Sequence, residues 1–504
     1  MHTPLTVIVP IRKGQDQVVR EHILALEPSL QAEFAQLPMV HFASFSIAGA
    51  FRDTPPSLVF EANIDGAAAP FLDALIGRCG SAFDAIFAHV EGFPASGCAM
   101  PGLAREFLLG NDVGADTYYV GCAGRTVTQI VAEDALRDEI GRVAQSGRDA
   151  EPMRRGECGP AREYLRQGVL ENPKFGWATP PAEPPSEVRY RFVLSIGVIL
   201  TALVILVVAG TLALHALAQV LACPWVEKHC CFCEPVLGVL NEFLSYPCLG
   251  GLNPLACVES ASGWHKAVAF LVWVDEKMFV AIVFVAAVFI VVLGPVSAYL
   301  QYYDRKVARS LPPILEPDWS RDPDIIKMEY KFGRVQNHLA SVTEVNHQLW
   351  LRRFMLGVVL WVVNLFGRIW YNQGTLGGIP GIHFARWVVF DKGRRLLFLS
   401  NYDGAWDSYL SDFVQFSFQG LNGIWGNTRQ ADRSYPPTLS FLWGGAQYEW
   451  LFKAYAGASQ VPTLFWYRAY EHLSTDNINN NTTVREGMSG AMTTAQADAW
   501  LRRI

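Results

Sequence analysis

Apolar residues in the first 145 positions recur in turn with the spacing of strands and of helices. A β-branched run or strict alternation is typical of a strand, whereas a period near four is typical of an amphipathic helix. This pattern predicts strands at 5–11, 40–47, 57–64, 83–90 and 117–122, and helices at 18–34, 65–76 and 103–109. The first six elements therefore have the order βαββαβ.

The same order returns near the C-terminus, because two segments of the chain repeat each other. Residues 58–66 read LVFEANIDG and residues 396–404 read LLFLSNYDG, while HFASF at 41–45 matches HFARW at 383–387. The second unit is predicted to have strands at 339–345, 383–390, 395–400, 423–426 and 463–469, and helices at 349–371, from 405, and at 447–456. The βαββαβ order is that of ferredoxin-like domains, so the sequence predicts an α+β protein of two such units paired as an intramolecular dimer.

Two long apolar segments separate the repeats. Residues 192–222 and 278–303 each exceed the roughly 20 residues that cross a bilayer. Arginine and lysine residues flank the outer ends of this pair and are sparse in the loop at 223–277, and such residues stay on the cytoplasmic side. We therefore expect a multi-pass protein of the plasma (bacterial inner) membrane, with both termini and both repeats cytoplasmic and the loop outside. The predicted parts are unit 1 at 1–149, a linker at 150–188, the transmembrane hairpin at 189–304, a linker at 305–334 and unit 2 at 335–504.

Composition adds one feature, a group of cysteines, to this predicted organisation. The net charge of −6 does not favour a nucleic acid as partner, and the 51% hydrophobic content agrees with a membrane protein. Six of the ten cysteines lie in the predicted outer loop, where an oxidising compartment favours disulfides. A metal site is the alternative, since residues 229–233 are dense in soft ligands but lack paired CxxC spacing. The candidate disulfide residues are Cys223, Cys230, Cys231, Cys233, Cys248 and Cys257.

The helix predicted at 349–371 differs from its amphipathic counterpart in the first unit. It contains 14 mostly apolar residues between Arg352-Arg353 and Arg368, too few to span a bilayer. We expect it to lie on the membrane surface or against the membrane anchor, with its arginines reaching lipid headgroups. Burial between the two units is the alternative.

The duplicated layout and the two Asp-Gly motifs resemble the dimeric α+β-barrel superfamily, which includes the dye-decolorizing peroxidases. The GxxDG motif of those peroxidases supplies an Asp that works with peroxide, beside a haem held by a His of the other half. Residues 62–66 and 400–404 keep the Asp-Gly, but Ala or Ser replaces the first Gly. The HFARW, SNYDG and NINNN stretches are also similar to a family of uncharacterised bacterial membrane proteins.

This resemblance implies an intramolecular α+β barrel with a haem site. His383 or His41 would be the axial ligand, and Asp403 or Asp65 would move the proton of a bound peroxide. Arg386, whose counterpart is only a serine, would stabilise an oxyanion or a haem propionate. No other metal site is expected.

Three functions remain open at this point. The first is a membrane-anchored, haem-binding, peroxidase-like oxidoreductase. The second is a non-catalytic membrane protein that binds a lipid or a partner membrane complex, or that forms homo-oligomers. The third is a cofactor-free monooxygenase of the same barrel class. A structural role for the shared residues is also open, because Asp-Gly between a strand and a helix suits helix capping and a strand-initial His often makes a structural hydrogen bond.

Overall fold

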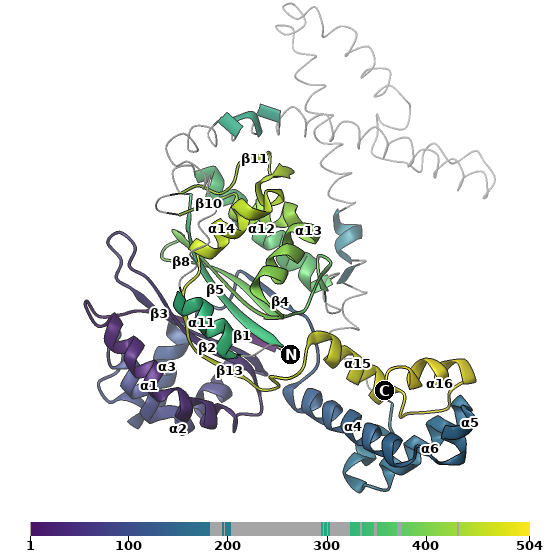
Figure 1. The fold of residues 1–504 in the computed structure, drawn as a ribbon. Coiled ribbons are helices and arrows are strands. Elements are labelled where there is room, and N and C mark those ends of the chain that lie inside the picture. Colours follow the sequence, from purple (N-terminus) through teal and green to yellow (C-terminus); the bar gives the residue numbers. More distant parts are fainter. Residues whose placement is uncertain are drawn as a thin grey trace, which may run out of the picture. The chain divides into compact units, whose positions relative to one another are not determined.

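Two antiparallel sheets pack against each other within the unit that residues 1–191 and 304–504 form (Figure 1). The computed structural model describes residues 2–181, 323–332, 335–346, 350–369, 375–430 and 433–504, with short pieces between 194 and 302. Most of the two predicted membrane segments and all six cysteines of the loop therefore lie outside the described residues. Residues 1–191 and 304–504 form one compact unit, and residues 192–303 form another.

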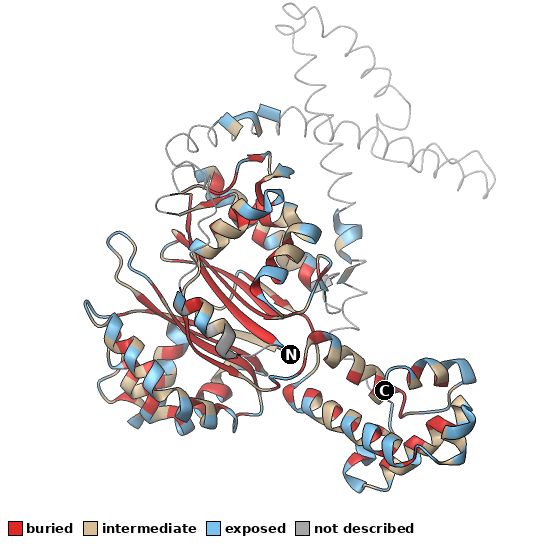
Figure 2. Cartoon of the chain, viewed as in Figure 1, coloured by how far each residue is buried: buried red, intermediate tan, exposed pale blue. Residues whose placement is uncertain are grey.

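The first sheet has the strand order β1-β3-β2-β13. Its strands are β1 (His2–Pro10), β2 (Val40–Ala48), β3 (Ser57–Asp65) and β13 (Thr463–Arg468). One face is covered by α1 (Asp16–Phe34) and α2 (Ala68–Phe87), whose apolar sides share a core with the strands. Figure 2 shows that the strands, and the sides of these helices that face them, are buried.

The second sheet has the order β10-β5-β9-β8-β4. Its strands are β4 (Thr117–Val120), β5 (Gln336–Val345), β8 (Ile382–Phe390), β9 (Arg395–Asp403) and β10 (Thr428–Arg429). Residues of α12 (Trp350–Ile369), α13 (Trp406–Trp425) and α14 (Glu449–Ala458) share its core. The structure is thus of mixed α+β class, as predicted, while the ferredoxin-like and barrel descriptions stay predictions.

Each sheet contains one strand from the opposite half of the chain. Trp466 of β13 pairs with Ser44 of β2, and Tyr118 of β4 pairs with Arg386 of β8. Ser44 and Arg386 are equivalent positions of the repeat, so the exchange is reciprocal. The strand segments were predicted within two or three residues, but each had been expected to complete its own unit. Backbone pairing within each sheet therefore joins the two halves of the chain.

Two predicted strands are helical in the structure. Residues 83–90 include the last turn of α2, and residues 423–426 include the end of α13. Short apolar runs do not distinguish a strand from a buried helix. Phe83, Ile86 and Phe87 are fully buried, because the helix turns these residues toward the sheet.

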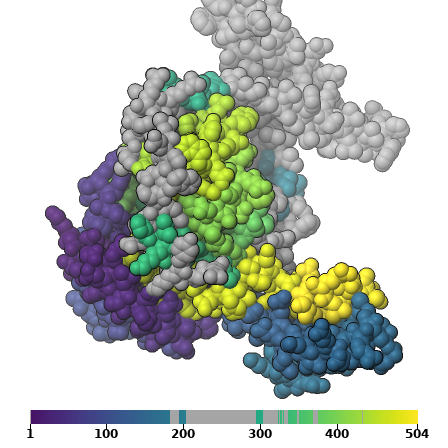
Figure 3. Space-filling model, viewed as in Figure 1, coloured from purple at the N-terminus to yellow at the C-terminus, as the bar shows by residue number. Residues whose placement is uncertain are grey.

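A helical cluster occupies the range expected as the first linker. Its elements are α4 (Val127–Ser146), α5 (Glu151–Arg155), α6 (Cys158–Leu170), η2 (Pro173–Ala178), α15 (Thr475–Glu486) and α16 (Thr494–Leu501). They share an apolar core, and Figure 3 shows the C-terminal helices lying against residues of the first half. The prediction of a linker at 150–188 is therefore wrong for residues 151–178. The amide-rich run at 476–481 lies in α15.

The remaining described elements are short. They are η1 (Gly97–Ala99), α3 (Pro101–Gly110), α11 (Pro323–Phe332), β6 (Thr375–Leu376), β7 (Ile379–Pro380), β11 (Thr438–Leu439), β12 (Trp443–Gly444) and η4 (Gly445–Gln447). Of these, α11 falls within the range predicted as the second linker, 305–334. Among the described residues, the stretch Trp350–Gly367 of α12 is the one helix long and apolar enough to cross a membrane.

Candidate functional site

The shared His and Asp residues form a close pair in each half of the chain. His41 Nε2 lies 3.1 Å from Asp65 Oδ1, and His383 Nε2 lies 2.8 Å from Asp403 Oδ1. Each His sits where the register of its strand shifts against the neighbouring strand. A bulge of this kind redirects a side chain, and here it accompanies an imidazole placed beside the Asp at the end of the adjacent strand. Both imidazoles are buried.

Each Asp also anchors a helix from later in the chain. Asp65 Oδ2 accepts a hydrogen bond from the backbone N–H of Val127 at the start of α4, at 2.8 Å. Asp403 Oδ2 accepts one from Thr475 N at the start of α15, also at 2.8 Å. Because α4 and α15 follow the exchanged strands, the carboxylates hold both ends of the exchange in place. Their negative charge also favours the N-terminal end of a helix dipole.

The Asp-Gly motif therefore has a different structural use from the one predicted. Helix α2 begins at Ala68 and its cap residue Ala67 makes no side-chain capping bond, so Asp65 does not cap the next helix. The glycines after the two Asp residues have φ of +85° and +83°, for Gly66 and Gly404. Only glycine adopts this backbone without strain, which accounts for Asp-Gly in both copies.

The two halves differ in the residue opposite each Asp. In the first sheet His2 of β1 pairs with Asp65, and in the second Gln336 of β5 pairs with Asp403. His2 Nδ1 lies 3.2 Å from Asp65 Oδ1. The Gln336 amide instead donates to the carbonyls of Leu473 at 2.6 Å and Tyr470 at 3.1 Å. The first half thus gathers two imidazoles at one carboxylate.

His2 was not among the residues singled out from sequence. It stands outside the motifs that repeat, and its position opposite Asp65 follows only from the register of β1 on β3. The repeat could not reveal it, because the equivalent position holds Gln336. Sequence reasoning therefore found two members of this cluster and missed the third.

Burial keeps His41 neutral near pH 7. Burial lowers the pKa of His41 to about 4, although the hydrogen bond to Asp65 raises this pKa. Burial raises the pKa of Tyr470 well above its usual value, so the phenol keeps its proton. The Tyr470 hydroxyl lies 2.8 Å from His41 Nδ1. It can donate there, so that the His41 Nε2–H donates to Asp65. Burial opposes the charge of Asp65, but the neighbouring His2 and His41 side chains lower the pKa of this carboxyl below its ordinary value.

The buried His41 predicts a loss of stability in mild acid. Its folded pKa of about 4 lies below the unfolded value of 6.5, so the unfolded state binds more protons between these values. The contribution of His41 to the free energy of unfolding is complete above pH 6.5. It falls by up to about 1.4 kcal/mol per pH unit as the pH is lowered to 4. Urea unfolding at pH 7, 6 and 5 would measure it. His41→Gln should flatten the slope, and an unchanged slope would contradict this role.

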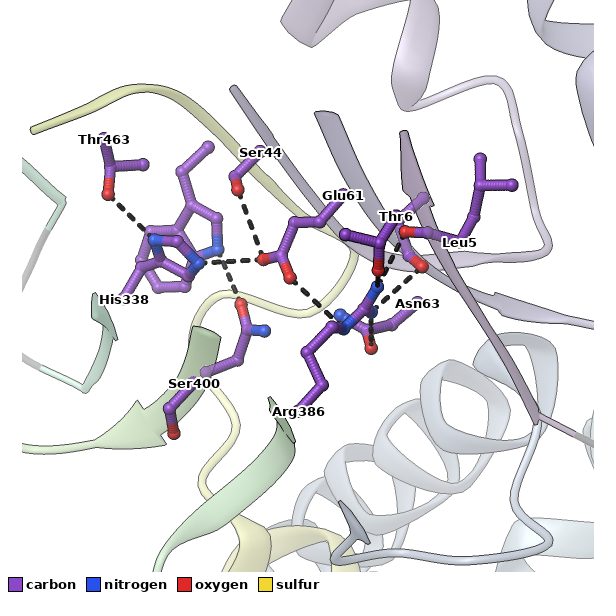
Figure 4. A network of polar contacts seen from close by, with 12 residues as sticks. Leu5, Thr6, Ser44, Glu61, Asn63, His338, Arg386, Ser400 and Thr463 are labelled. Carbon is purple, nitrogen blue, oxygen red and sulfur yellow. Dashed lines mark hydrogen bonds and ion pairs between the residues drawn. The ribbon is translucent and has the colours of Figure 1, made fainter. Parts of the chain in front are cut away.

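A second buried polar cluster lies between the two sheets, around Glu61 (Figure 4). His338 Nε2 lies 2.8 Å from Glu61 Oε1, and Ser44 donates to the same oxygen at 3.2 Å. Arg386 Nε lies 3.5 Å from Glu61 Oε2. The His338 Nδ1 atom reaches the Thr463 hydroxyl at 2.8 Å. Burial disfavours the carboxylate, but Arg386 and His338 offset it and hold the pKa of Glu61 below its usual value.

Arg386 is saturated by protein groups. One terminal nitrogen donates to the Leu5 carbonyl and the Thr6 hydroxyl, and the other donates to the Ala62 carbonyl and the Asn63 side chain. With Nε directed at Glu61, each nitrogen of the guanidinium has a protein partner. The expectation that Arg386 stabilises an oxyanion or a propionate stays a prediction, and in this arrangement its nitrogens are bound by protein groups. Its partner Glu61 was missed, because the equivalent position in the second repeat is Leu399.

The residues around the two imidazoles do not fit a haem as placed. Each ring packs against the phenylalanine of the other repeat, His41 on Phe384 at 5.1 Å and His383 on Phe42 at 5.3 Å between centroids. Both Nε2 atoms face carboxylates, so neither is directed at an open axial position. The pockets described lie along α12 and between α12, α13 and α14, with mainly apolar walls. No step through a haem is derived, and haem binding stays a prediction.

Comparison with known proteins adds no family. No family model, no curated protein and no solved structure matches this chain. A fold alone does not define a function, so the function must be inferred from the geometry of these residues.

Proposed function

We propose that this protein is a non-catalytic membrane protein whose folded unit binds the surface of a lipid bilayer through α12. The observation that carries the proposal is a stripe of large apolar side chains on one face of this helix. Trp350, Phe354 and Trp361 are 76%, 60% and 63% exposed, and Val358 between them is 43% exposed. Spacings of four, four and three residues place these side chains on one side of a helix.

The opposite face of α12 holds the helix against the folded unit. Leu356 and Leu360 are buried in the core of the second sheet. The Leu360 carbonyl accepts a hydrogen bond from the Thr117 hydroxyl of β4 at 2.7 Å. One side of the helix is therefore committed to protein, which favours an orientation along the membrane surface rather than across the bilayer.

The arginines at the start of α12 divide between these faces. Arg352 is buried and donates to the Gly426 carbonyl and the Asn427 side chain, so the expectation that it reaches headgroups is wrong. Arg353 lines the exposed groove together with Trp350 and Trp361. A cation beside tryptophans is the composition found at bilayer interfaces, where anionic headgroups and acyl chains meet.

A lipid surface suits this stripe better than a soluble partner. Soluble proteins seldom expose a contiguous group of large apolar side chains without a use for it. The same chain carries two apolar segments of spanning length, at 192–222 and 278–303, and these would keep the folded unit near a bilayer. We therefore propose that the lipid bilayer, in which those segments would be embedded, covers this apolar stripe.

An enzymatic role is less well supported by the same residues. The paired His and Asp anchor α4 and α15 in both halves, and Arg386 has its nitrogens bound by protein. A peroxidase-like oxidoreductase or a monooxygenase would need a polar group directed at an open cavity. The retained motifs are instead explained by the fold.

The test uses a photoreactive amino acid in place of Trp361 in the full chain, within native membranes. Illumination is expected to give covalent lipid adducts, detected by mass spectrometry of the peptide that contains α12. The matched control carries the same amino acid at Leu103 of α3, which is 47% exposed and lies on the first-half helix. That position should give at most a background level of lipid adducts.

Three results would overturn the proposal. Crosslinks from position 361 solely to residues 192–303 would show that the chain itself covers the stripe. Crosslinks solely to another protein would identify a protein partner. Equal lipid labelling at 103 and 361 would also contradict a specific membrane face.

A further inference from the structure

We propose that His2, His41 and Asp65 form a binding site for a divalent transition metal of the zinc type. Their candidate ligand atoms all lie within 4.8 Å of one another. His41 Nε2 is 3.1 Å and His2 Nδ1 is 3.2 Å from Asp65 Oδ1. A tetrahedral zinc with bonds of about 2.0–2.1 Å needs ligand atoms roughly 3.3–3.5 Å apart, so small shifts would suffice.

The His2 imidazole supplies an independent reason to expect a ligand. Its side chain is 3% exposed, and its Nδ1 atom makes no hydrogen bond of acceptable geometry, even though Asp65 is near. A buried ring nitrogen whose contact with a carboxylate is poorly directed is less well stabilised than one with a good hydrogen bond. A metal at this point would satisfy it, and two imidazoles with one carboxylate are a common set of ligands for zinc and other divalent transition metals.

Neighbouring groups would orient the other two ligands. The Tyr470 hydroxyl can accept a hydrogen bond from the His41 Nδ1–H, which leaves the His41 Nε2 lone pair for the metal. The backbone N–H of Val127 holds Asp65 Oδ2 and leaves Oδ1 facing both imidazoles. Supporting hydrogen bonds of this kind are typical of protein metal sites.

One contact must open when the metal binds. The backbone N–H of Gly124 donates to His2 Nε2 at 3.1 Å, so in the metal-free protein the His2 proton is on Nδ1. Coordination through Nδ1 moves this proton to Nε2 and breaks the Gly124 contact. The His41 proton likewise moves from Nε2 to Nδ1, so the number of bound protons is unchanged. We therefore expect weaker binding than at a fully preformed site.

The second half of the protein supplies the matched control. Gln336 occupies the position equivalent to His2, beside the same His and Asp pair. The variant His2→Gln therefore recreates a combination that already folds in this chain. It removes one proposed ligand and leaves His41, Asp65 and the helix anchor in place.

The experiment is a zinc titration of the full chain, without an affinity tag, in detergent after chelator treatment. We expect one zinc site that His2→Gln weakens by more than about 100-fold, beyond the 10–100-fold typical of losing an outer-shell partner. Zinc should also raise the unfolding temperature of the unaltered protein and not of the variant. The cysteine-rich loop is identical in both proteins, so zinc bound there cancels in the comparison.

A cobalt titration distinguishes metal binding by the His and Asp cluster from metal binding by the cysteines of the loop. Thiolate ligation gives an intense charge-transfer absorption that His and Asp ligation does not. A cobalt spectrum without that absorption, lost in His2→Gln, would support the site. Equal zinc stoichiometry and affinity in the two proteins, or a cobalt spectrum of thiolate type alone, would overturn it.

Discussion

Replacing Arg386 with methionine is expected to destabilise the folded unit by about 3–5 kcal/mol, because it leaves Glu61 charged and buried without its main cation. Glu61 and Arg386 are 0% and 1% exposed. The substitution also removes donors from the Leu5 and Ala62 carbonyls. Each unsatisfied buried acceptor adds to the cost. Urea unfolding of the variant in detergent, followed by near-ultraviolet circular dichroism, would measure the change.

Two further variants make the Arg386 prediction specific. Arg105→Met breaks an ion pair with Asp73 in which the side chains are 41% and 49% exposed, and it should cost less than about 1 kcal/mol. Adding Glu61→Leu to Arg386→Met removes the orphaned charge and should recover part of the loss. If Arg386→Met costs no more than Arg105→Met, the buried pair does not hold the sheets together. If the double variant is no more stable than the single one, the charge of Glu61 is not the cause.

Much of the fold follows from local patterns in the sequence. Alternating residues predicted β2, β3, β8 and β9 to within a few residues, and the duplicated HF and DG motifs predicted that His41 and His383 would occupy equivalent places. These elements are long, and their patterns are local. The repeat singled out His41, His383, Asp65 and Asp403 as candidates, but the direct contact of each imidazole with its Asp was not predicted.

The missed features depend on contacts that local patterns do not encode. The apolar run at Phe83 suits a helix and a strand equally, and only packing against the first sheet decides between them. His2 and Glu61 have Gln336 and Leu399 at the equivalent positions, so comparison of the repeats directed attention away from both. The two halves share a framework, and the chemistry that distinguishes them lies in the residues that do not repeat.

The exchange of strands could not be predicted from the sequence either, because alternating residues identify a strand but do not show which strand it pairs with. After exchange, side chains still reach back toward their own half. Trp466 in the first sheet donates to Asn401 of the second at 2.8 Å, and Tyr118 in the second donates to Asn63 of the first at 3.2 Å. Each exchanged strand is thus bonded to both sheets. Unfolding of the halves should accordingly be coupled.

The exchange predicts that a core substitution in one half of the chain will loosen the other half. Phe465 of β13 is fully buried against Phe34 and Phe45, which belong to the first half. Phe465→Ala is expected to cost about 3–5 kcal/mol. Hydrogen exchange measured by mass spectrometry should show the largest loss of protection in α1 and β2. The second-half strands β8 and β9 should change less.

The reciprocal variant tests the same idea from the other side. Tyr119 of β4 is 1% exposed in the core of the second sheet, and it pairs with Ala385 of β8. Tyr119→Ala should therefore increase hydrogen exchange mainly in β8 and α12, although the substituted residue belongs to the first half. Loss of protection confined to each residue's own half would show that the strands are not exchanged. Crossed effects in both variants would establish that neither half of the duplication completes its core without a strand of the other.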